Sequence, residues 1–312
     1  MTGKASARPR ALFIGHTYID ITFLTDRIPT GDEKYVAQDY AVSFGGNAVT
    51  AAFCCARLAE GGMAVDLIAT HADDWLGRMF LEMAGRYEVS IHPRAVGESS
   101  LSFIMPNNGK RAIVRCRDDA YLETFPQIDV HSLAGLHIDG HQPDAALHYA
   151  RLCRDAGVLT SLDGGSVRHN TDEVLKYIDV AIVSERFCEQ MNLTAAQMLD
   201  RLHKAGCKVG GVTRGEHGLL WFEGDSGARV TPALAVPSDK VIDTSGAGDI
   251  FHGAYLWSRL TRPGNAWAEH FKFASAASAF KVQKLGNEAG LPTQADIARM
   301  RQLFAESAAR PA

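Results

Sequence analysis

The residues best suited to chemistry form one run late in the chain, Asp-Thr-Ser-Gly-Ala-Gly-Asp at residues 243–249. A glycine-rich turn that opens a helix exposes several backbone N–H groups beside the positive end of the helix dipole. The turn Gly246-Ala247-Gly248 therefore predicts an anion hole that holds a phosphoryl group as negative charge develops on it. Asp249 follows the turn directly. We expect it to stay ionised and to accept a proton from a hydroxyl group held against it.

Other interpretations of this run make different demands on the sequence. An aspartate after a glycine turn could serve only to complement the helix dipole. A nicotinamide-dependent dehydrogenase would need a third glycine at position 251, where Phe251 stands, and would carry the motif in its first βαβ unit. The phosphate-binding pattern G-x-x-x-x-G-K-[ST] does not occur in the 312 residues. The sequence therefore disfavours both of these nucleotide-binding motifs.

The elements that must position this run follow an alternating pattern. Short apolar runs rich in β-branched residues alternate with longer helical patterns, as βαβ units require. This alternation predicts an α/β fold, a doubly wound and mostly parallel sheet with helices on both faces. We expect strands at 11–14, 65–70, 135–138, 158–162, 180–183 and 209–213, and helices at 47–59, 75–86, 254–260 and from 294 onward.

Two segments, 17–42 and 98–117, interrupt the alternation with strand-like sequence. The second resembles a β-hairpin, because Leu101–Met105 and Ala112–Arg115 flank a turn that contains Asn108-Gly109. Two β segments inserted in an α/β chain can pair as a small sheet, and such a sheet could close as a lid over the ligand crevice. We therefore expect one domain over residues 1–312, with a lid formed by the two segments.

Composition restricts the partners of the chain. The net charge is −4, which provides no general basic field for nucleic acid or for an anionic membrane. No apolar stretch approaches the roughly 18 residues that a membrane-spanning helix needs. The six cysteines show no C-x-x-C spacing and are expected to be small buried side chains. We expect a cytoplasmic protein that binds neither nucleic acid nor membrane.

Residues 243–249 resemble the second signature of the phosphofructokinase-B, or ribokinase-like, family of carbohydrate kinases. The resemblance extends to Val42-Ser-Phe-Gly-Gly-Asn47 before an alanine-rich helix, to Asp20 after the first strand, and to Thr213-Arg-Gly-Glu-His-Gly218. Order and spacing agree over roughly residues 11–292. The resemblance implies a doubly wound sheet with a β lid, and ATP-dependent phosphorylation of a sugar hydroxyl.

The resemblance also implies roles for individual residues. It implies ATP and Mg²⁺ as cofactors, a monovalent cation such as K⁺, and a homodimer that forms through the lid. The implied sugar site is Asp20, Gly45, Gly46 and Asn47; the anion hole is Gly246, Ala247 and Gly248 with Asp249 as base; the nucleotide site is Thr213, Gly215, Gly218 and Ser184; and the monovalent-cation loop contains Asp243.

The chain departs from the family at its magnesium motif. The family commonly carries N-x-x-E after a middle strand, whereas this chain has Ser184-Glu-Arg-Phe187. Glu185 is the predicted magnesium ligand, and Glu189 is a second choice. Neither is in register with the family glutamate. The departure leaves open a catalytically weak sugar or nucleotide sensor on the same fold, and a nucleoside kinase of the same family is a further alternative.

The acceptor is less well defined than the reaction. Lys34-Tyr-Val-Ala37 resembles the sulfofructose kinases within the family, but the arginine that those kinases carry near the end of a later strand is absent from Ile138-Asp-Gly-His-Gln142. Lys110, Arg111, Arg115 and Arg117 cluster in the second lid segment. We expect Lys34 to bind a negative group on the substrate. The alternative is a solvated basic edge that discourages strand pairing.

The segment His137-Ile-Asp139-Gly-His141 carries three polar side chains that would share one face of a strand. A metal site is one interpretation, although no fourth ligand is apparent. Substrate contact at the carboxyl end of the strand and purely structural roles are the others.

Overall fold

The computed structural model describes residues 8–107 and 110–304. Its main sheet has nine strands in the order β13-β12-β11-β10-β9-β8-β1-β4-β5. Seven of them are parallel, and β12 and β13 add to one edge in antiparallel pairing. The strands are β1 Arg10–Gly15, β4 Ala64–His71, β5 Val89–Ala95, β8 Gly135–Ile138, β9 Leu159–Gly164, β10 Val180–Ser184, β11 Val209–Thr213, β12 Leu219–Glu223 and β13 Arg229–Thr231.

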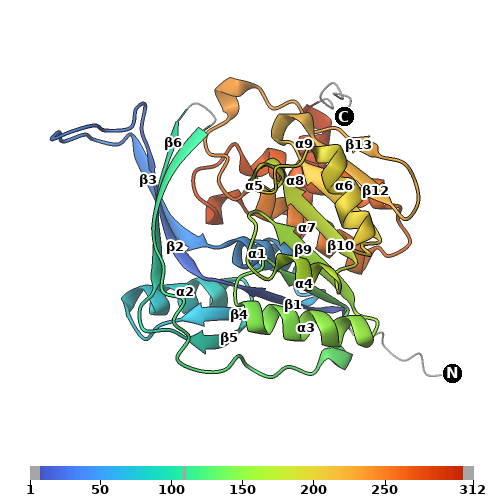
Figure 1. The fold of residues 1–312 in the computed structure, drawn as a ribbon. Coiled ribbons are helices and arrows are strands. Elements are labelled where there is room, and N and C mark those ends of the chain that lie inside the picture. Colours follow the sequence, from blue (N-terminus) through green and yellow to red (C-terminus); the bar gives the residue numbers. More distant parts are fainter. Residues whose placement is uncertain (1–7, 108–109, 305–312) are drawn as a thin grey trace.

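Helices cover both faces of this sheet (Figure 1). Successive strand residues point to opposite faces, so Phe13 packs into one apolar cluster while Leu12 and Ile14 pack into the other. The predicted doubly wound architecture is confirmed. The first face carries α1 Asn47–Ala59, α2 Trp75–Arg86, α7 Ala247–Thr261, α8 Trp267–Lys281 and α9 Gln294–Leu303; the second carries α3 Pro143–Asp155, α4 Thr171–Leu175, α5 Glu185–Gln190 and α6 Ala195–Lys204.

A second sheet of four strands forms the expected lid, in the order β3-β2-β6-β7. Strands β2 and β6 pair in parallel and join the two inserted segments, while β3 and β7 pair antiparallel at the edges. The predicted turn at 108–109 lies outside the described residues. The lid stands at one end of the main sheet (Figure 1). Its strands are β2 Tyr18–Leu24, β3 Asp39–Gly45, β6 Ser100–Asn107 and β7 Lys110–Cys116.

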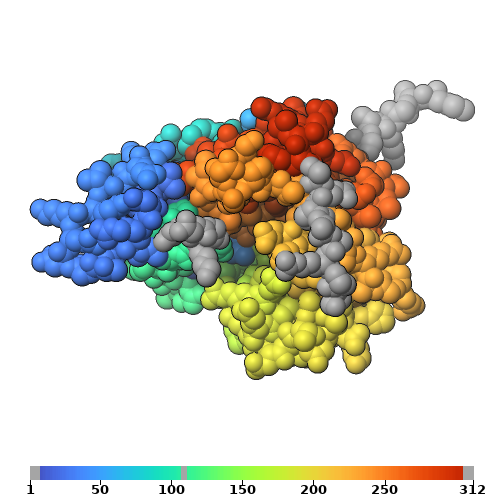
Figure 2. Space-filling view, turned by 90° about the horizontal axis from the view of Figure 1, so that it is seen from above, coloured from blue at the N-terminus to red at the C-terminus, as the bar shows by residue number. Residues whose placement is uncertain are grey.

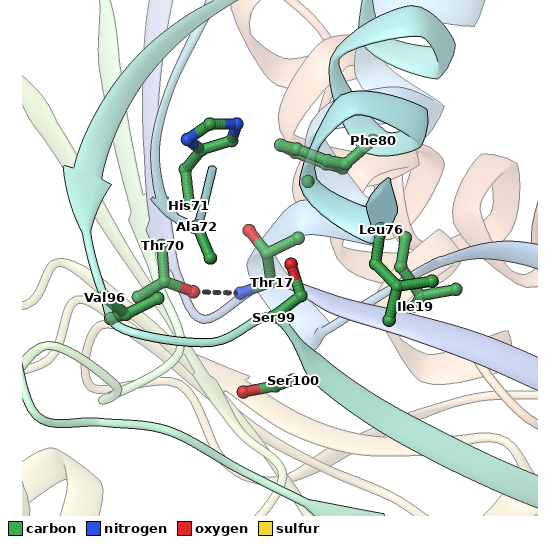
Figure 3. A pocket seen from close by; sticks show the side chains of 11 residues that line it. Thr17, Ile19, Thr70, His71, Ala72, Leu76, Phe80, Val96, Ser99 and Ser100 are labelled. Atoms are coloured by element: carbon green, nitrogen blue, oxygen red, sulfur yellow. Dashed lines mark hydrogen bonds between the residues drawn. The ribbon is translucent and has the colours of Figure 1, made fainter. Parts of the chain in front are cut away.

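The chain enters the lid at two places that lie side by side. Thr17 connects β1 to β2, while Ser99 ends the connection from β5 and Ser100 begins β6. These residues line a small pocket against the first turn of α2 (Figure 3). The backbone N–H of Thr17 donates to Oγ1 of Thr70 at 2.9 Å, which ties the crossing to the end of β4. The pocket marks the base of the lid and contains none of the predicted catalytic residues.

Most expected elements form close to their predicted bounds, but one differs where it affects chemistry. Helix α7 begins at Ala247, not after the glycine turn, so the predicted anion hole is its first helical turn. Strands β5, β12 and β13 and helix α8 were not predicted. Within residues 8–107 and 110–304, no helix combines the length and apolar character needed to cross a membrane.

Candidate active site

Polar side chains converge where the parallel strands of the main sheet end. Asp139 follows β8 and Asp163 lies near the end of β9. The first turn of α1 meets both of them: Asn47 Nδ2 donates to Asp163 Oδ2 at 3.1 Å, and the N–H of Ala48 donates to Asp139 Oδ2 at 3.1 Å. The carboxyl edge of such a sheet is where ligands of open α/β folds bind. Seen from above, the surface is hollowed between the lid and the yellow and orange segments (Figure 2).

The glycine turn of α7 has the backbone that an anion hole needs. Gly246 precedes the helix with φ +72°, and no side chain caps the exposed N–H groups of the first turn. A Cβ at Gly246 would lie 2.3 Å from Oδ1 of Asn287, so only glycine fits between the turn and that side chain. The first turn of α7 therefore presents backbone N–H groups at the positive end of the helix, although the N–H of Ala247 also lies 3.4 Å from the carbonyl oxygen of Thr244.

Asp249 lies in this first turn and is partly buried. Burial and the neighbouring Asp163 carboxylate raise the pKa of Asp249 to about 8, while Arg111 and Arg115 of the lid oppose the rise. The direction of this shift opposes the expectation that Asp249 stays ionised, because a neighbouring carboxylate disfavours a second negative charge.

Asp163 is the second carboxylate of this pair. Burial raises its pKa to about 7, and Asp139 adds to the rise, while the hydrogen bond from Asn47 lowers it. His252 Nε2 lies 3.5 Å from Asp163 Oδ1, but burial lowers the pKa of His252 to about 3, so this imidazole is neutral and supplies no balancing charge. Asp163 was not predicted, although a carboxylate directly after the expected strand 158–162 was a usable signal.

The predicted sugar-site residues also come together. Asp20 lies on β2, where Asn287 Nδ2 donates to its Oδ2 at 3.1 Å, and burial raises the pKa of Asp20 to about 6. A Cβ at Gly45 would lie 2.3 Å from the Asp20 carboxyl, and one at Gly46, with φ +103°, would lie 2.0 Å from the carbonyl oxygen of His16. Both glycines are therefore required for this close approach. Asn47 caps no helix end: its amide reaches Asp163 instead.

Asn287 was not predicted, since it lies in a short 3-10 turn that carries no motif. Its amide also donates to the carbonyl oxygen of Phe44 at 2.9 Å. This side chain therefore joins the C-terminal part of the chain to lid strands β2 and β3.

The expected nucleotide residues lie at the ends of two neighbouring strands. Ser184 and Thr213 are partners in the parallel register of β10 and β11. Gly215 and Gly218 form the tight connection from β11 to β12, and a Cβ at Gly218, with φ +80°, would lie 2.2 Å from the carbonyl oxygen of Thr231. Ser184 Oγ accepts from the N–H of Phe187 at 3.1 Å and so caps α5. The turn thus has a structural reason for its glycines in addition to the predicted binding role.

The predicted metal residues have different surroundings. Glu185 and Glu189 are exposed on α5, while Phe187 is buried in the apolar cluster beneath that helix. Asp243 is fully buried, and the ammonium group of Lys281 lies 3.1 Å from its Oδ2.

Lys34 does not lie beside the predicted sugar-site residues. It is exposed on the loop 25–38, which projects beyond the lid (Figure 1). This loop carries its own cross-links, including an Arg27–Glu33 ion pair and an Arg27 guanidinium 4.5 Å from the centre of the Tyr35 ring.

The predicted polar trio on the strand after residue 135 divides into two groups. His141 pairs with Asp139, and their contact together with backbone N–H groups holds the pKa of Asp139 below its ordinary value although burial alone would raise it. His137 instead hydrogen bonds to Ser161 at 2.9 Å and faces His252, with their ring centres 5.2 Å apart. Potential ligand atoms of His137, Asp163 and His252 lie within 4.8 Å of one another. The strand ends at Ile138, so the predicted common face does not extend to residue 141.

Known proteins of one family match this chain over most of its length. The family model described as pfkB family carbohydrate kinase matches residues 8–294. A ribokinase of Lactococcus lactis is 25% identical over 303 residues, which cover 93% of this chain and 96% of that protein.

Solved structures show the same fold. Ribokinase from Thermotoga maritima has a TM-score of 0.77 at 20% identity and covers 95% of this chain and 100% of its own. Arabidopsis thaliana ribokinase, solved with ribose and ATP, has a TM-score of 0.77 at 22% identity and covers 94% of this chain and 98% of its own. The chain therefore belongs to the pfkB family of carbohydrate kinases and is a sugar kinase, a phosphotransferase with an alcohol group as acceptor.

Proposed function

We propose that the chain transfers the γ-phosphoryl group of ATP to a sugar hydroxyl, with Asp249 as the general base. The position of Asp249 in the first turn of α7, directly after the backbone N–H groups of residues 246–248, carries this proposal. A base and an anion hole in one turn can act on the two ends of the same transfer: one takes the proton of the hydroxyl, and the other stabilises the phosphoryl charge.

The remaining residues position the acceptor. Asp20 and Asn47 hold sugar hydroxyls, while Gly45 and Gly46 allow the backbone to approach closely. The lid excludes water that would otherwise accept the phosphoryl group. Thr213, Gly215, Gly218 and Ser184 line the nucleotide side, where two strand ends and the β11–β12 connection meet. Direct in-line transfer needs no covalent intermediate on the protein.

Asp163 is a better candidate for the Mg²⁺ ligand than the predicted Glu185. Asp163 raises the pKa of Asp249, and Asp139 raises the pKa of both Asp163 and Asp249; a divalent cation relieves such repulsion between carboxylates. When bound, Mg²⁺ neutralises phosphate charge. Asp163→Asn should therefore raise the Mg²⁺ concentration needed for half-maximal rate, whereas Glu185→Gln on the exposed surface of α5 should not. The reverse outcome would return the role to Glu185.

The described residues favour an acceptor that carries a negative group. Arg115 faces Ser102 across β6 and β7, and Ser102 faces Asp20 across β2 and β6, so one row of the lid leads from the sugar site to this guanidinium. Arg115 lies 4.9 Å from the centre of the Tyr18 ring. Arg168 enters from the loop after β9, where its Nη2 lies 2.8 Å from His141 Nε2.

Two more observations support this acceptor class. Burial raises the pKa of Tyr18, and the positive charges of Arg115, Arg117 and Arg168 all oppose this rise. The buried Nε of Arg168 has no hydrogen-bond partner among the described residues. Among the acidic groups nearby, Asp119 pairs with Arg117 and Asp139 with His141, whereas Asp20 and Asp249 have no ion-pair partner among the described residues. Binding of the negative group by Lys34 stays a prediction, because the projecting loop 25–38 would have to move Lys34 closer to the sugar site.

Matched acceptors test this preference. Fructose and fructose 6-phosphate differ only in the phosphate, and gluconate offers a carboxylate. Arg115→Gln and Arg168→Gln should lower kcat/KM for the acidic acceptors by roughly 10–150-fold, the loss of a charge-assisted hydrogen bond, and leave neutral acceptors within a few-fold. Lys34→Ala distinguishes a direct contact between Lys34 and the acidic acceptor from a lysine that is only solvated on its loop. Arg151→Gln, at an exposed arginine of α3, is the matched control for the two arginine variants. Equal losses on neutral and acidic acceptors would remove the idea.

The lid also supports the proposed homodimer. Its outer surface carries exposed apolar side chains at Tyr40, Phe103 and Val114, and Phe23 stacks on Phe103 with ring centres 6.2 Å apart. Exposed apolar side chains on a small sheet favour pairing with another copy. Light scattering of wild type and Val114→Lys would test this. Five of the six cysteines are buried, as expected, whereas Cys116 at the end of lid strand β7 is exposed.

Transfer of label from [γ-³²P]ATP to a panel of sugars and nucleosides tests the proposed function directly. Label on a sugar supports it, and label on nucleosides alone would favour the nucleoside kinase. Equilibrium binding without transfer would favour the catalytically weak sensor.

A further inference from the structure

The oxygen atoms around Asp243 already hold a cation that belongs to the chain. Lys281 Nζ donates to the Asp243 carbonyl oxygen at 3.1 Å, to Asp243 Oδ2 at 3.1 Å and to the carbonyl oxygen of Lys284 at 3.3 Å. Both the Lys281 and Asp243 side chains are buried, with exposures of 0% and 1%. Two carbonyl oxygens and a carboxylate oxygen are hard donors of the kind that a bound alkali cation uses.

The surrounding residues fit the lysine closely. Lys281 is the last residue of α8, and its side chain passes beside Gly290, where an added Cβ would lie 2.0 Å from Lys281 Cδ. The carboxyl of Asp243 is otherwise satisfied by backbone donors: the N–H of Ser245 binds Oδ1 at 2.8 Å, and that of Gly286 binds Oδ2 at 3.1 Å. A separate monovalent cation does not fit a place that an ammonium group occupies with three oxygen contacts.

We propose that the ammonium group of Lys281 takes the place of a bound monovalent cation at Asp243, so that catalysis by this chain does not depend on K⁺ or Na⁺. The inference rests on the proposed kinase function. Buried charges are retained in proteins where they are paired and hydrogen bonded, and both conditions hold here. The lysine supplies the same single positive charge as K⁺, and its position is fixed by a covalent bond to helix α8.

This ion pair connects directly to the active site. Asp243 begins the loop that ends in the anion hole, and its N–H lies 3.2 Å from the carbonyl oxygen of Val282, next to Lys281. On the other side, Gly286 binds Asp243 and the following Asn287 binds Asp20 at 3.1 Å. The ammonium group therefore links two parts of the site. One is the turn that is proposed to bind the phosphoryl group, and the other is Asn287, which orients the proposed sugar-binding carboxylate of Asp20. Lys281 acts as a positioning residue, since it acts through Asp243 and Asn287.

The first test uses the unaltered protein. Rates are measured with one proven acceptor at fixed Mg²⁺ and fixed ionic strength, with KCl, NaCl or tetramethylammonium chloride as the salt. Tetramethylammonium is too large for a site of three oxygen atoms. We expect kcat and KM to agree within about twofold in the three salts. A rate that is at least about tenfold higher in KCl would overturn the inference and leave the kinase function intact.

The second test creates the missing site. Lys281→Ala removes the ammonium group and leaves room for an ion, and Lys281→Met retains most of the volume. Both variants should lose kcat by at least about tenfold in tetramethylammonium, and KCl, NH₄Cl or methylammonium chloride should restore activity to Lys281→Ala. Lys272→Ala on the same helix, where the lysine pairs with Glu269 on the surface, is the matched control.

A measurement independent of activity completes the test. The melting temperature of Lys281→Ala should rise with KCl relative to tetramethylammonium chloride, because an ion that binds only the folded state stabilises it, while wild type should show no difference. If Lys281→Ala does not fold, the wild-type salt series and Lys281→Met still decide the question. Absence of phosphoryl transfer in every salt would instead count against the proposed function.

Discussion

Gly45→Ala tests whether the close approach of β3 to Asp20 serves substrate binding. The added Cβ would lie 2.3 Å from all three carboxyl atoms of Asp20, whereas ordinary contact begins at 3.4 Å, so the carboxylate must retreat by roughly 1 Å. This movement weakens the hydrogen bond from Asn287, now 3.1 Å long. A displacement of about 1 Å in a positioning group can cost on the order of 10²-fold in rate. We expect a loss of that size in kcat/KM for the sugar.

Coupled ADP release measures this loss with either substrate varied. The KM for ATP should change little, since Asp20 lies on the lid strand β2 and not beside the nucleotide residues of β10 and β11. Gly85→Ala in helix α2 is the matched control, because an added Cβ there meets no atom within 4 Å. A Gly45→Ala enzyme that retains near-wild-type kcat/KM and a folded circular dichroism spectrum would refute the assignment of Asp20 to the sugar.

Three further predictions follow from the same residues. Because the base must be ionised and burial raises the pKa of Asp249 to about 8, kcat/KM should rise with pH through the range of about 7–8. Asp163→Asn should move this rise in kcat/KM to lower pH, because it removes the neighbouring negative charge. A rise that stays at the same pH would contradict the coupling of the two carboxylates. The same raised pKa means that Asp249 keeps its proton in the folded state above pH 3.8, where the unfolded state loses it. The contribution of Asp249 to the unfolding free energy should therefore fall as pH rises from about 4 to 8. Urea titrations at about pH 8 should show Asp249→Asn to be more stable than wild type. Sugar binding should protect the amides of β2, β3, β6 and β7 from hydrogen exchange, and unchanged exchange at saturation would argue against a closing lid.

The pattern of apolar residues predicted most of the fold, because helices and strands each have a characteristic spacing of apolar residues. The parallel strands β1, β4 and β8 to β11, helix α1 and the lid hairpin all follow from hydrophobic alternation and turn residues, whereas the edge strand β5 was not predicted. Strands β12 and β13 were not predicted because they are short additions at the sheet edge. The start of α7 was placed too late, since Gly246 and Gly248 interrupt the apolar pattern although the backbone is already helical from Ala247.

The candidate site was predicted only where a motif names it. The glycine turn, Asp249, Asp20 and the Gly45-Gly46-Asn47 run were found in this way. Asn287 and Lys281 come from other parts of the chain, and only the tertiary fold brings them to Asp20 and Asp243. The raised pKa of Asp249 could not be predicted either, because it depends on burial and on the neighbouring Asp163 carboxylate, neither of which is local in sequence.

The most direct test of the central claim is the turnover of Asp249→Asn with a proven acceptor. The amide keeps the size of the side chain but cannot take a proton. The account predicts that kcat falls by at least about 10²–10⁴-fold, the contribution of a general base, while ATP affinity measured by calorimetry stays close to wild type. Near-normal turnover in this variant would contradict the assignment of Asp249 as the base.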